Sequence, residues 1–398
     1  MKAAGDRLYH QAGPFSSLVA ASSDSRTTGI LDRRVGGWIY MHGNPSEPRQ
    51  TIDNLKGEIA FRAKLAVQHV SGEVLLPDYY QKADHDRILQ DRVEATHRKM
   101  NELATLGINL SPFLELGAER GQRSLVLTND FGANGIAVDI SYHQLKSMEH
   151  FAKLFNRPTL PMRICCDANH LPFKSNSFPF IFCYEFLHHF PALGPIVREI
   201  HRVAARGYFY FDEEPFRRAV KLALYRQRSK IYSERALRKH WYLRLIESFI
   251  SESPCDEVEH GVIENEKLSL TEWLTALSIF EQRDIDLVSL DKLRSKLGRR
   301  LRPSNILNYL LGGSIAGLCR KAPESAKDGP VELRDTLACP DCMTRRNAGA
   351  LDRPSLVEVR WGYRCVECGF TYPCIDGIIF LLPPGQLQQL YPELWSIP

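Results

Sequence analysis

The sequence has 398 residues, of which 44% are hydrophobic and 25% are charged, and its formal net charge is +4 at pH 7. This length allows a large core and a second domain, and the composition is that of a globular protein. The small net charge does not argue for nucleic-acid binding, and no apolar run approaches the roughly 20 residues that span a bilayer.

The start of the sequence shows no apolar stretch of the kind found in secretory signals, so the chain is expected in the cytoplasm. Its ten cysteines are therefore expected to be metal ligands and buried thiols and not disulfides. Residues 1–54 are weakly patterned and are predicted to be weakly ordered. Residues 55–110 are predicted to form a helical extension, because apolar residues over 87–107 recur at helical spacing and end at Gly107.

Short apolar runs alternate with helical patterns from residue 113 onward. The runs are nearly continuous, as expected for strands covered on both faces, and their order predicts a doubly wound, mostly parallel α/β sheet. Strands are predicted at 112–116, 135–140, 161–168, 178–184, 207–213, 285–290 and 314–321. The predicted domain therefore covers 111–321, with seven strands and a helical insertion at 216–284.

The segment FLELGAERG, residues 113–121, joins the first strand to a helix through two glycines. Gly117 can form a tight turn and Gly121 can begin the helix, so that a ligand can approach the backbone and the free N–H groups of the helix start. Two glycines at this spacing are a weak signal alone, because an ordinary strand-to-helix corner also uses glycine.

Polar residues follow the next three strands at their carboxyl ends, the edge where open α/β sheets bind ligands. Asp139 ends the second strand 22 residues after Gly117, where the ribose-binding acid of a nucleoside site belongs. Asp167 follows the third strand and can accept a hydrogen bond from an exocyclic amine. The run CYEFLHHF, residues 183–190, follows the fourth strand.

Residues 113–215 resemble the class I S-adenosylmethionine-dependent methyltransferases. The run DANHLPF (167–173), followed by an apolar strand and two histidines, resembles in particular the group that includes ubiquinone and menaquinone methyltransferases. The resemblance implies that the first loop holds the methionine part of S-adenosyl-L-methionine, the acid after strand two its ribose, and the aspartate after strand three its adenine amine. The implied cofactor-binding residues are Glu115, Gly117, Gly121, Asp139, Ile140, Asp167, Ala168 and Tyr184.

One position of the first loop departs from the family pattern. The family has a third, middle glycine where this chain has Glu119. A side chain there can crowd the cofactor or point away from it. The first case leaves open a protein that acts as a scaffold and transfers no methyl group, whereas the retained acids favour a working site.

The end of the fourth strand faces the transferred methyl group in that family. Tyr184, Glu185, His188 and His189 are therefore the candidate catalytic residues. A histidine with a pKa near neutrality is suited to deprotonating an acceptor. Packing of the two histidines over the cofactor is an equally good interpretation.

The insertion after the fifth strand is polarised in charge. Residues 217–244 and 292–302 are basic, and residues 251–273 are acidic. The basic stretches can contact an anionic acceptor, such as a phosphate-bearing metabolite, a lipid carrier or RNA, but a solvated helix face explains them at least as well. A small-molecule or carrier-bound acceptor is therefore expected first, and an RNA methyltransferase is the alternative.

Two C-x-x-C pairs lie in the last part of the sequence. Cys339 and Cys342 are followed, after 22 residues, by Cys365 and Cys368. This spacing predicts a tetrahedral zinc site with four thiolate ligands. Because four protein ligands leave no open position, the zinc is expected to be structural.

The unit that holds these cysteines is predicted at 333–398, after a linker at 322–332. Its C-x-x-C pairs, the Tyr-Pro of 372–373 and the Leu-Leu-Pro of 381–383 resemble the small zinc-ribbon proteins that activate tRNA and protein methyltransferases. This resemblance implies docking on a protein partner or within the same chain. The sequence as a whole predicts a methyltransferase with a structural zinc ribbon.

Overall fold

The computed structural model describes residues 50–76, 82–217, 225–226, 251–252, 256–265, 268–288, 313–322, 332–345 and 355–395. The predicted segment before residue 50, nearly all of both basic stretches and most of the linker lie outside these residues. Among the helices that are described, none is long and apolar enough to cross a membrane.

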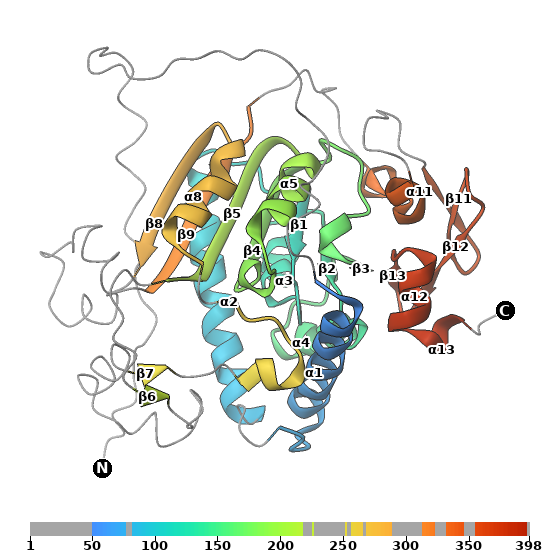
Figure 1. Ribbon diagram of the computed structural model, residues 1–398, viewed down its shortest axis with the longest axis horizontal. Helices are drawn as coiled ribbons and strands as arrows, with labels where there is room; N and C mark the ends of the chain where they lie inside the picture. Colours follow the sequence, from blue (N-terminus) through green and yellow to red (C-terminus); the bar gives the residue numbers. More distant parts are fainter. Residues whose placement is uncertain are drawn as a thin grey trace, which may run out of the picture.

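Two long helices precede the sheet. α1 (Ile52–Ser71) begins after Thr51, whose side chain accepts a hydrogen bond from the backbone of Asn54, and it ends at Gly72 in a left-handed conformation. α2 (Lys82–Thr105) follows. Both helices lie along the same side of the molecule (Figure 1).

A mixed sheet runs through the molecule in the order β10-β11-β12-β13-β3-β2-β1-β4-β5-β9-β8. Its strands are β1 (Phe113–Leu116), β2 (Gly135–Asp139), β3 (Met162–Cys165), β4 (Phe178–Tyr184), β5 (Ala204–Phe216), β8 (Gln282–Val288), β9 (Gly313–Arg320), β10 (Leu356–Val359), β11 (Gly362–Cys365), β12 (Thr371–Ile375) and β13 (Ile378–Phe380). A separate pair is β6 (Tyr225–Arg226) with β7 (Ser251–Glu252).

Helices connect and cover these strands. The α-helices are α3 (Gln122–Asp130), α4 (Tyr142–Leu154), α5 (Leu193–Val203), α8 (Leu270–Ala276), α11 (Pro340–Arg345), α12 (Pro384–Leu390) and α13 (Pro392–Trp395). The short 3-10 helices are η1 (Ala168–His170), η2 (Leu187–His189), η3 (Asp256–His260), η4 (Leu277–Ile279) and η5 (Leu333–Thr336). The βα alternation of β1 to β5 is the one that the apolar runs predict.

The prediction of seven mostly parallel strands is wrong for the sheet as a whole. Over the described residues the sheet has eleven strands. Five neighbouring pairs are parallel and five are antiparallel. The extra strands come from the C-terminal unit, which the sequence suggests is separate but which extends the same sheet.

The strands divide their side chains between two faces. Leu114 and Leu116 of β1 enter the largest core cluster, together with the apolar face of α5. Phe113 points the other way, into a cluster with Met100 and Leu103 of α2. Successive side chains of a strand point to opposite faces of the sheet. Because both faces are covered by apolar cores here, each strand appears in the sequence as a continuous apolar run.

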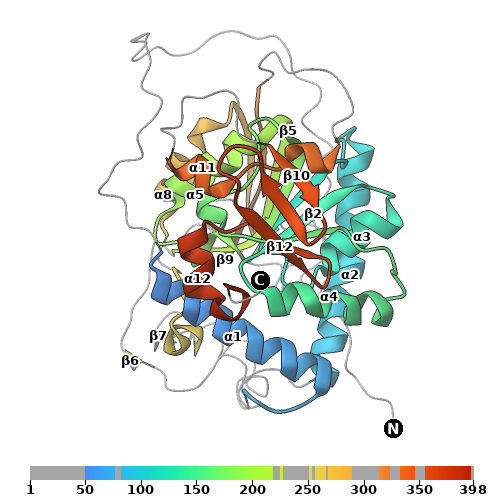
Figure 2. The ribbon, with the colours of Figure 1, turned by 90° about the vertical axis from the view of Figure 1, so that its right-hand side faces the viewer.

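The C-terminal unit docks on its own chain at the edge of the sheet. β13 pairs with β3 in parallel, with Ile379 opposite Ile164 and Phe380 opposite Cys165. α12 then lies beside α1, as Figures 1 and 2 show from two directions. Leu387 of α12 shares a core cluster with Leu55 of α1. Of the two arrangements that the resemblance implies, the structure shows the second, in which the C-terminal unit packs on its own chain.

Candidate functional site

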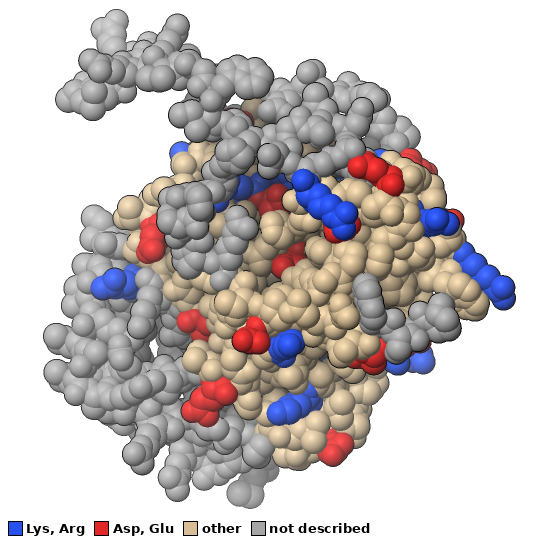
Figure 3. Space-filling model, turned by 45° about the vertical axis from the view of Figure 1, so that its right-hand side comes forward, with Lys and Arg blue, Asp and Glu red and all other residues tan. Residues whose placement is uncertain are grey.

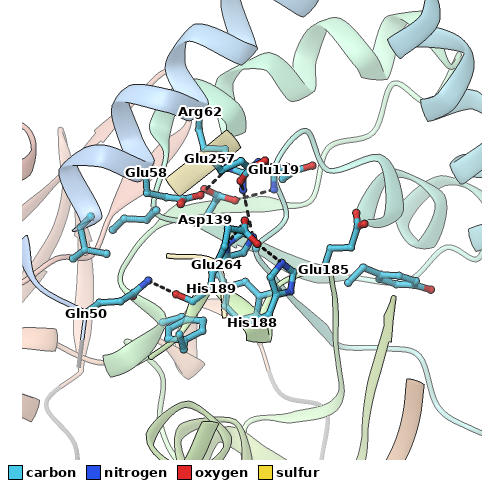
Figure 4. A pocket seen from close by; sticks show the side chains of 18 of the residues that line it. Gln50, Glu58, Arg62, Glu119, Asp139, Glu185, His188, His189, Glu257 and Glu264 are labelled. Atoms are coloured by element: carbon cyan, nitrogen blue, oxygen red, sulfur yellow. Dashed lines mark hydrogen bonds and ion pairs between the residues drawn. The ribbon is translucent and has the colours of Figure 1, made fainter. Parts of the chain in front are cut away.

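A cavity of about 280 Å³ lies at the carboxyl ends of the central strands. Its wall is formed by the loops after β1, β2, β3 and β4, by α1 and by the segment around η3 (Figure 4). Eight of the sequence-predicted site residues line it: Gly117, Asp139, Ile140, Ala168, Tyr184, Glu185, His188 and His189. The other candidates, Glu115, Gly121 and Asp167, are not part of the wall.

The glycine turn after β1 is tightly built. Gly117 has a φ of 62°, and a Cβ there would come within 2.4 Å of the Phe186 ring. Gly121 has a φ of 66° and begins α3, and a Cβ there would meet Met148. Both positions therefore favour glycine, because each has a positive φ and because Phe186 packs against Gly117 and Met148 of α4 against Gly121.

Glu119, which stands where the family has a glycine, also has a positive φ of 47°. Its carboxylate forms ion pairs of 3.1 Å with Arg62 of α1 and with Arg120. Burial raises the pKa of this carboxyl, but the charges of Arg120 and Arg62 outweigh burial and lower it to about 2. Glu119 is therefore an anion held in the cavity wall by two arginines.

Arg62 pairs with Glu58 of its own helix and connects α1 to two other segments of the site. Its guanidinium lies 2.7 Å from Glu58, 3.1 Å from Glu119 and 3.3 Å from Glu257. Burial lowers the pKa of Arg62, but the three carboxylates outweigh it and raise the pKa. This network closes the cavity on the side of α1, as Figure 4 shows.

Glu115 lies near the end of β1 and Asp139 ends the adjacent strand β2, but only Asp139 lines the cavity. Glu115 is buried below the turn and accepts hydrogen bonds from the backbone and hydroxyl of Ser124, so it caps α3. Asp139 lines the cavity, and its two oxygens accept from the backbone N–H groups of Glu119 (2.9 Å) and Ser141 (2.8 Å). Burial raises the pKa of Asp139 to about 6.

Asp167 is not part of the cavity wall, although Ala168 beside it is. One oxygen of Asp167 accepts from the backbone and side chain of Asn169, both at 2.9 Å. The other accepts from the amide of Gln386 on α12, at 2.8 Å. The carboxylate therefore joins the loop after β3 to the C-terminal unit.

The turn after β4 is held by one buried carboxylate, Glu214. Its oxygens accept from the backbone N–H groups of Phe186, Leu187 and His188 at 2.7, 2.8 and 3.2 Å. The same carboxylate lies 2.9 Å from Nδ1 of His188. Glu214 is fully buried, so the strand end of β5 fixes the backbone on which both candidate histidines sit.

His188 lies between two carboxylates. Nδ1 faces Glu214, and Nε2 lies 3.4 Å from Glu264. Burial lowers the pKa of His188, but the hydrogen bonds to Glu214 and Glu264 outweigh it and raise the pKa to about 10. His188 is therefore an imidazolium at neutral pH, which neutralises part of the acidic wall.

His189 has the opposite protonation state. Nδ1 donates to the carbonyl of Ile263 at 2.9 Å, and Nε2 lies 3.4 Å from a nitrogen of Arg62. Burial and the neighbouring positive charge of His188 lower the pKa of His189. A neutral imidazole with a fixed Nδ1–H has its lone pair on Nε2, which faces Arg62 here and which a general base would use once an acceptor replaces that contact.

Glu264 reaches the histidines because its loop is tied to the turn after β4. The backbone of Asn265 donates to the carbonyl of His188 at 2.8 Å. Ligand atoms of His188, His189 and Glu264 lie within 4.8 Å of one another. Both histidines already have partners at each ring nitrogen, and these contacts account for the cluster through ordinary hydrogen bonds and charges.

Tyr184 and Glu185 complete the end of β4. The guanidinium of Arg123 lies 3.9 Å above the centre of the Tyr184 ring, and burial raises the pKa of the phenol well above its usual value. Glu185 is half-exposed and pairs with Arg92 of α2 at 2.9 Å. Tyr184 thus stays neutral and forms a flat wall of the cavity.

The four predicted metal ligands come together in the C-terminal unit. Sγ of Cys339 lies 3.7 Å from that of Cys368, and Sγ of Cys342 lies 3.8 Å from that of Cys365. A tetrahedron with metal–sulfur bonds of about 2.3 Å has edges of about 3.8 Å. The donor set and the spacing of these thiols therefore fit one metal ion.

Three residues of the site are not identified by the sequence analysis, namely Arg62, Glu214 and Glu257. Arg62 and Glu257 lie in helices whose place over the cavity depends on tertiary packing. The sequence does contain one indication of Glu214, because this residue ends a run of three acids at the carboxyl end of a predicted strand, the edge where ligands bind.

Residues 114–211 match the family model described as "Methyltransferase domain". The chain is also similar to solved structures at low identity. A complex between the Haloferax volcanii Trm112 methyltransferase activator and a methyltransferase has 15% identity and a TM-score of 0.37, covering 61% of this chain and 95% of that one. Geranyl diphosphate C-methyltransferase from Streptomyces coelicolor has 11% identity and a TM-score of 0.39, covering 67% and 98%.

The [4+2]-cyclase SpnF has 16% identity and a TM-score of 0.41, covering 70% of this chain and 98% of that one. These similarities are too low to bear on the acceptor or on a partner. The family match covers the strands that build the cavity, from β1 to β5. This chain therefore contains a methyltransferase domain.

Proposed function

We propose that the cavity binds S-adenosyl-L-methionine and that the chain methylates a small-molecule or carrier-bound acceptor. The observation that carries this proposal is Asp139. Its buried carboxylate faces the cavity beside Gly117, and each oxygen holds one backbone N–H and retains a lone pair. Two free lone pairs on a fixed carboxylate suit the two hydroxyls of a ribose.

The other cofactor contacts follow from the cavity wall. Gly117 would lie against the methionine part, and Ile140 and Ala168 would lie on either side of the adenine. Glu115 and Gly121 would act indirectly, because they shape the turn. Asp167 would reach the adenine amine only at the rim, since it is not among the residues that line the cavity.

His189 is the residue to which we assign the proton of the acceptor. The cofactor would supply a methyl group that its sulfonium already activates, so the protein has to orient the acceptor and take its proton. Nε2 of His189 is neutral and lines the cavity, whereas His188 is already protonated. Tyr184 and Glu185 would hold the acceptor, and His188 would fix the turn.

The charges around the cavity support an acceptor that is not strongly anionic. Glu185, Glu213, Glu257 and Glu264 line the side of the cavity at the ends of β4 and β5 and around η3. Arg62 is already paired with three carboxylates. On the described part of the surface in Figure 3, Lys and Arg are interspersed with Asp and Glu, whereas a basic stripe is the usual footprint of RNA binding.

The C-terminal unit is proposed to be a structural zinc ribbon. Four thiols at tetrahedral spacing support Zn²⁺, and backbone N–H groups of Cys342 and Cys368 lie 3.5 Å from the first thiol of each pair. The DANHLPF run supports the ubiquinone- and menaquinone-methyltransferase group as the subfamily.

The proposal is tested by calorimetric titration with S-adenosylmethionine and S-adenosylhomocysteine. Wild-type protein is expected to bind both, and Asp139→Asn is expected to weaken binding by about tenfold to a hundredfold, because hydrogen bonds to a charged group are lost. Asp84→Asn, an exposed aspartate on α2, is the control and is expected to bind normally. A wild-type protein that binds neither ligand would refute the proposed site.

A further inference from the structure

The adenine side of the proposed cofactor site is built partly by the C-terminal unit. β13 extends the sheet beside β3, and the backbone of Leu381 donates to the carbonyl of Cys165 at 2.9 Å. Because β13 runs parallel to β3, the chain leaves it at the same edge as the loops after β2 and β3. α12 and the residues after it are thus delivered to the rim of the cavity.

Gln386 of α12 contacts the loop after β3. Its amide donates to Asp167 at 2.8 Å, and the other oxygen of Asp167 accepts from Asn169. Asn169 in turn donates to Gln50, whose own amide donates to the carbonyl of His189 at 2.8 Å. One chain of hydrogen bonds therefore runs from α12 around the cavity to the proposed base.

Tyr391 contacts the loop after β2. Its hydroxyl donates to the carbonyl of Ile140 at 2.5 Å and accepts from the backbone N–H of Tyr142 at 3.1 Å. The ring is buried against Phe380, with ring centres 5.3 Å apart. Ile140 lines the cavity and Asp139 precedes it, so the tyrosine fixes the loop that carries the proposed ribose-binding acid.

We propose that Gln386 and Tyr391 are positioning residues of the cofactor site, which hold the adenine-side loops in their binding conformation. Gln386 sets the orientation of Asp167, and Tyr391 sets the position of Ile140 and Asp139. This inference rests on the proposed function. It adds that the C-terminal unit helps to build the cofactor site, through residues other than its four clustered cysteines. The acceptor oxygen of Asp167 that receives Gln386 has a second lone pair, which is available to the exocyclic amine of adenine.

The test compares S-adenosylhomocysteine with S-inosylhomocysteine, which carries a carbonyl in place of the exocyclic amine. Calorimetric titration of the full-length wild type is expected to favour the adenosyl ligand. Gln386→Ala is expected to lower the affinity for S-adenosylhomocysteine by about tenfold, because Asp167 loses its orientation. The ratio of the affinities for the adenosyl and inosyl ligands is expected to fall as well. Tyr391→Phe is expected to weaken both ligands by a similar factor, since it loosens the ribose side.

The same helix offers the control. Gln389 is exposed, and among the described residues its side chain donates within α12, to the carbonyl of Gly385. Gln389→Ala is therefore expected to bind both ligands as the wild type does. Melting curves of all variants separate positioning from loss of fold, because a change in the ratio of the two affinities does not follow from lower stability. The inference would be overturned, with the proposed function left standing, if Gln386→Ala kept the wild-type affinities and their ratio and Tyr391→Phe kept the wild-type affinities. A wild type that binds neither ligand would overturn the proposed function as well.

Discussion

Two adjacent histidines have opposite charge states in this site, and their partners explain why. His188 lies between the carboxylates of Glu214 and Glu264 and is protonated at neutral pH. His189 lies beside Arg62 and donates to a carbonyl, so it stays neutral. Sequence position alone cannot separate these roles, because it does not show which neighbours each ring meets.

The assignment of His189 as the base predicts the acid limb of the pH profile. A base works when it is deprotonated, and the lowered pKa keeps His189 deprotonated below pH 6.5, its ordinary value. Single-turnover rates of methyl transfer are therefore expected to stay level from pH 7.5 through 6.5 and to fall only at lower pH. His189→Asn is expected to lower the rate by about 10² to 10⁴-fold with S-adenosylhomocysteine still bound.

His97 is the control for this experiment, since it is half-exposed on α2 and pairs with Asp130 outside the cavity. His97→Asn is expected to keep the rate and its pH profile. Wild-type rates in His189→Asn would show that another group takes the proton.

At this scale, the cysteines and Asp139 were predictable because each belongs to a local motif with a fixed spacing. Glu214 and Arg62 were not, because the partners that place them in the site, His188 and Glu119, lie 26 and 57 residues away along the chain. Asp167 shows a third case. Its position at the end of β3 was foreseen, but its side chain is directed by Gln386, a residue 219 positions later.

Among the elements, β13 has the largest effect on the architecture. The edge of β3 would otherwise present unpaired N–H and C=O groups, and β13 covers it with a three-residue strand. The apolar runs predicted β1 to β5, β8 and β9 because their side chains alternate into two cores. They could not show that the C-terminal unit joins the same sheet, because pairing between distant strands leaves no periodic signal.

Phe380 tests whether this strand and the sheet fold together. Its side chain is fully buried and packs against Tyr142 and Tyr391. Phe380→Ala is expected to lower the free energy of unfolding by about 3–5 kcal/mol, through lost burial and a cavity, in one transition for both units. Val357→Ala on β10 removes an exposed side chain and is expected to change it by less than about 0.5 kcal/mol. Two separate transitions in the denaturation curve would contradict joint folding.

At the scale of the whole molecule, the cluster of four cysteines proposed to bind zinc shares one core with the sheet. Cys339, Cys342 and Cys365 belong to the same buried cluster as Leu116 of β1 and Ile196 of α5. A small unit of this kind depends on its metal for folding. Loss of the metal is therefore expected to affect the cofactor domain and not the ribbon alone.

Metal analysis of purified protein is expected to find one zinc ion per chain. Cys365→Ser is expected to lose the ion and to lower the melting temperature of the whole protein. Cys374→Ser removes an exposed thiol of the same unit outside the cluster and is expected to keep both zinc and melting temperature. Protein with no stoichiometric zinc, or Cys365→Ser with unchanged metal content, would contradict the zinc assignment.

The pairing of β13 with β3 has a consequence for biosynthesis. A ribosome releases the segment 378–391 long after β3 has left the exit tunnel, since more than 200 residues separate Cys165 from Phe380. Until then the edge of β3 lacks its pairing with β13, and the loops that carry Asp139 and Asp167 lack their hydrogen bonds to Tyr391 and Gln386. A chain whose translation stops early would thus carry an exposed sheet edge, a recognised route to aggregation. Assembly of the proposed cofactor site therefore has to wait until residues 378–391 have been synthesised.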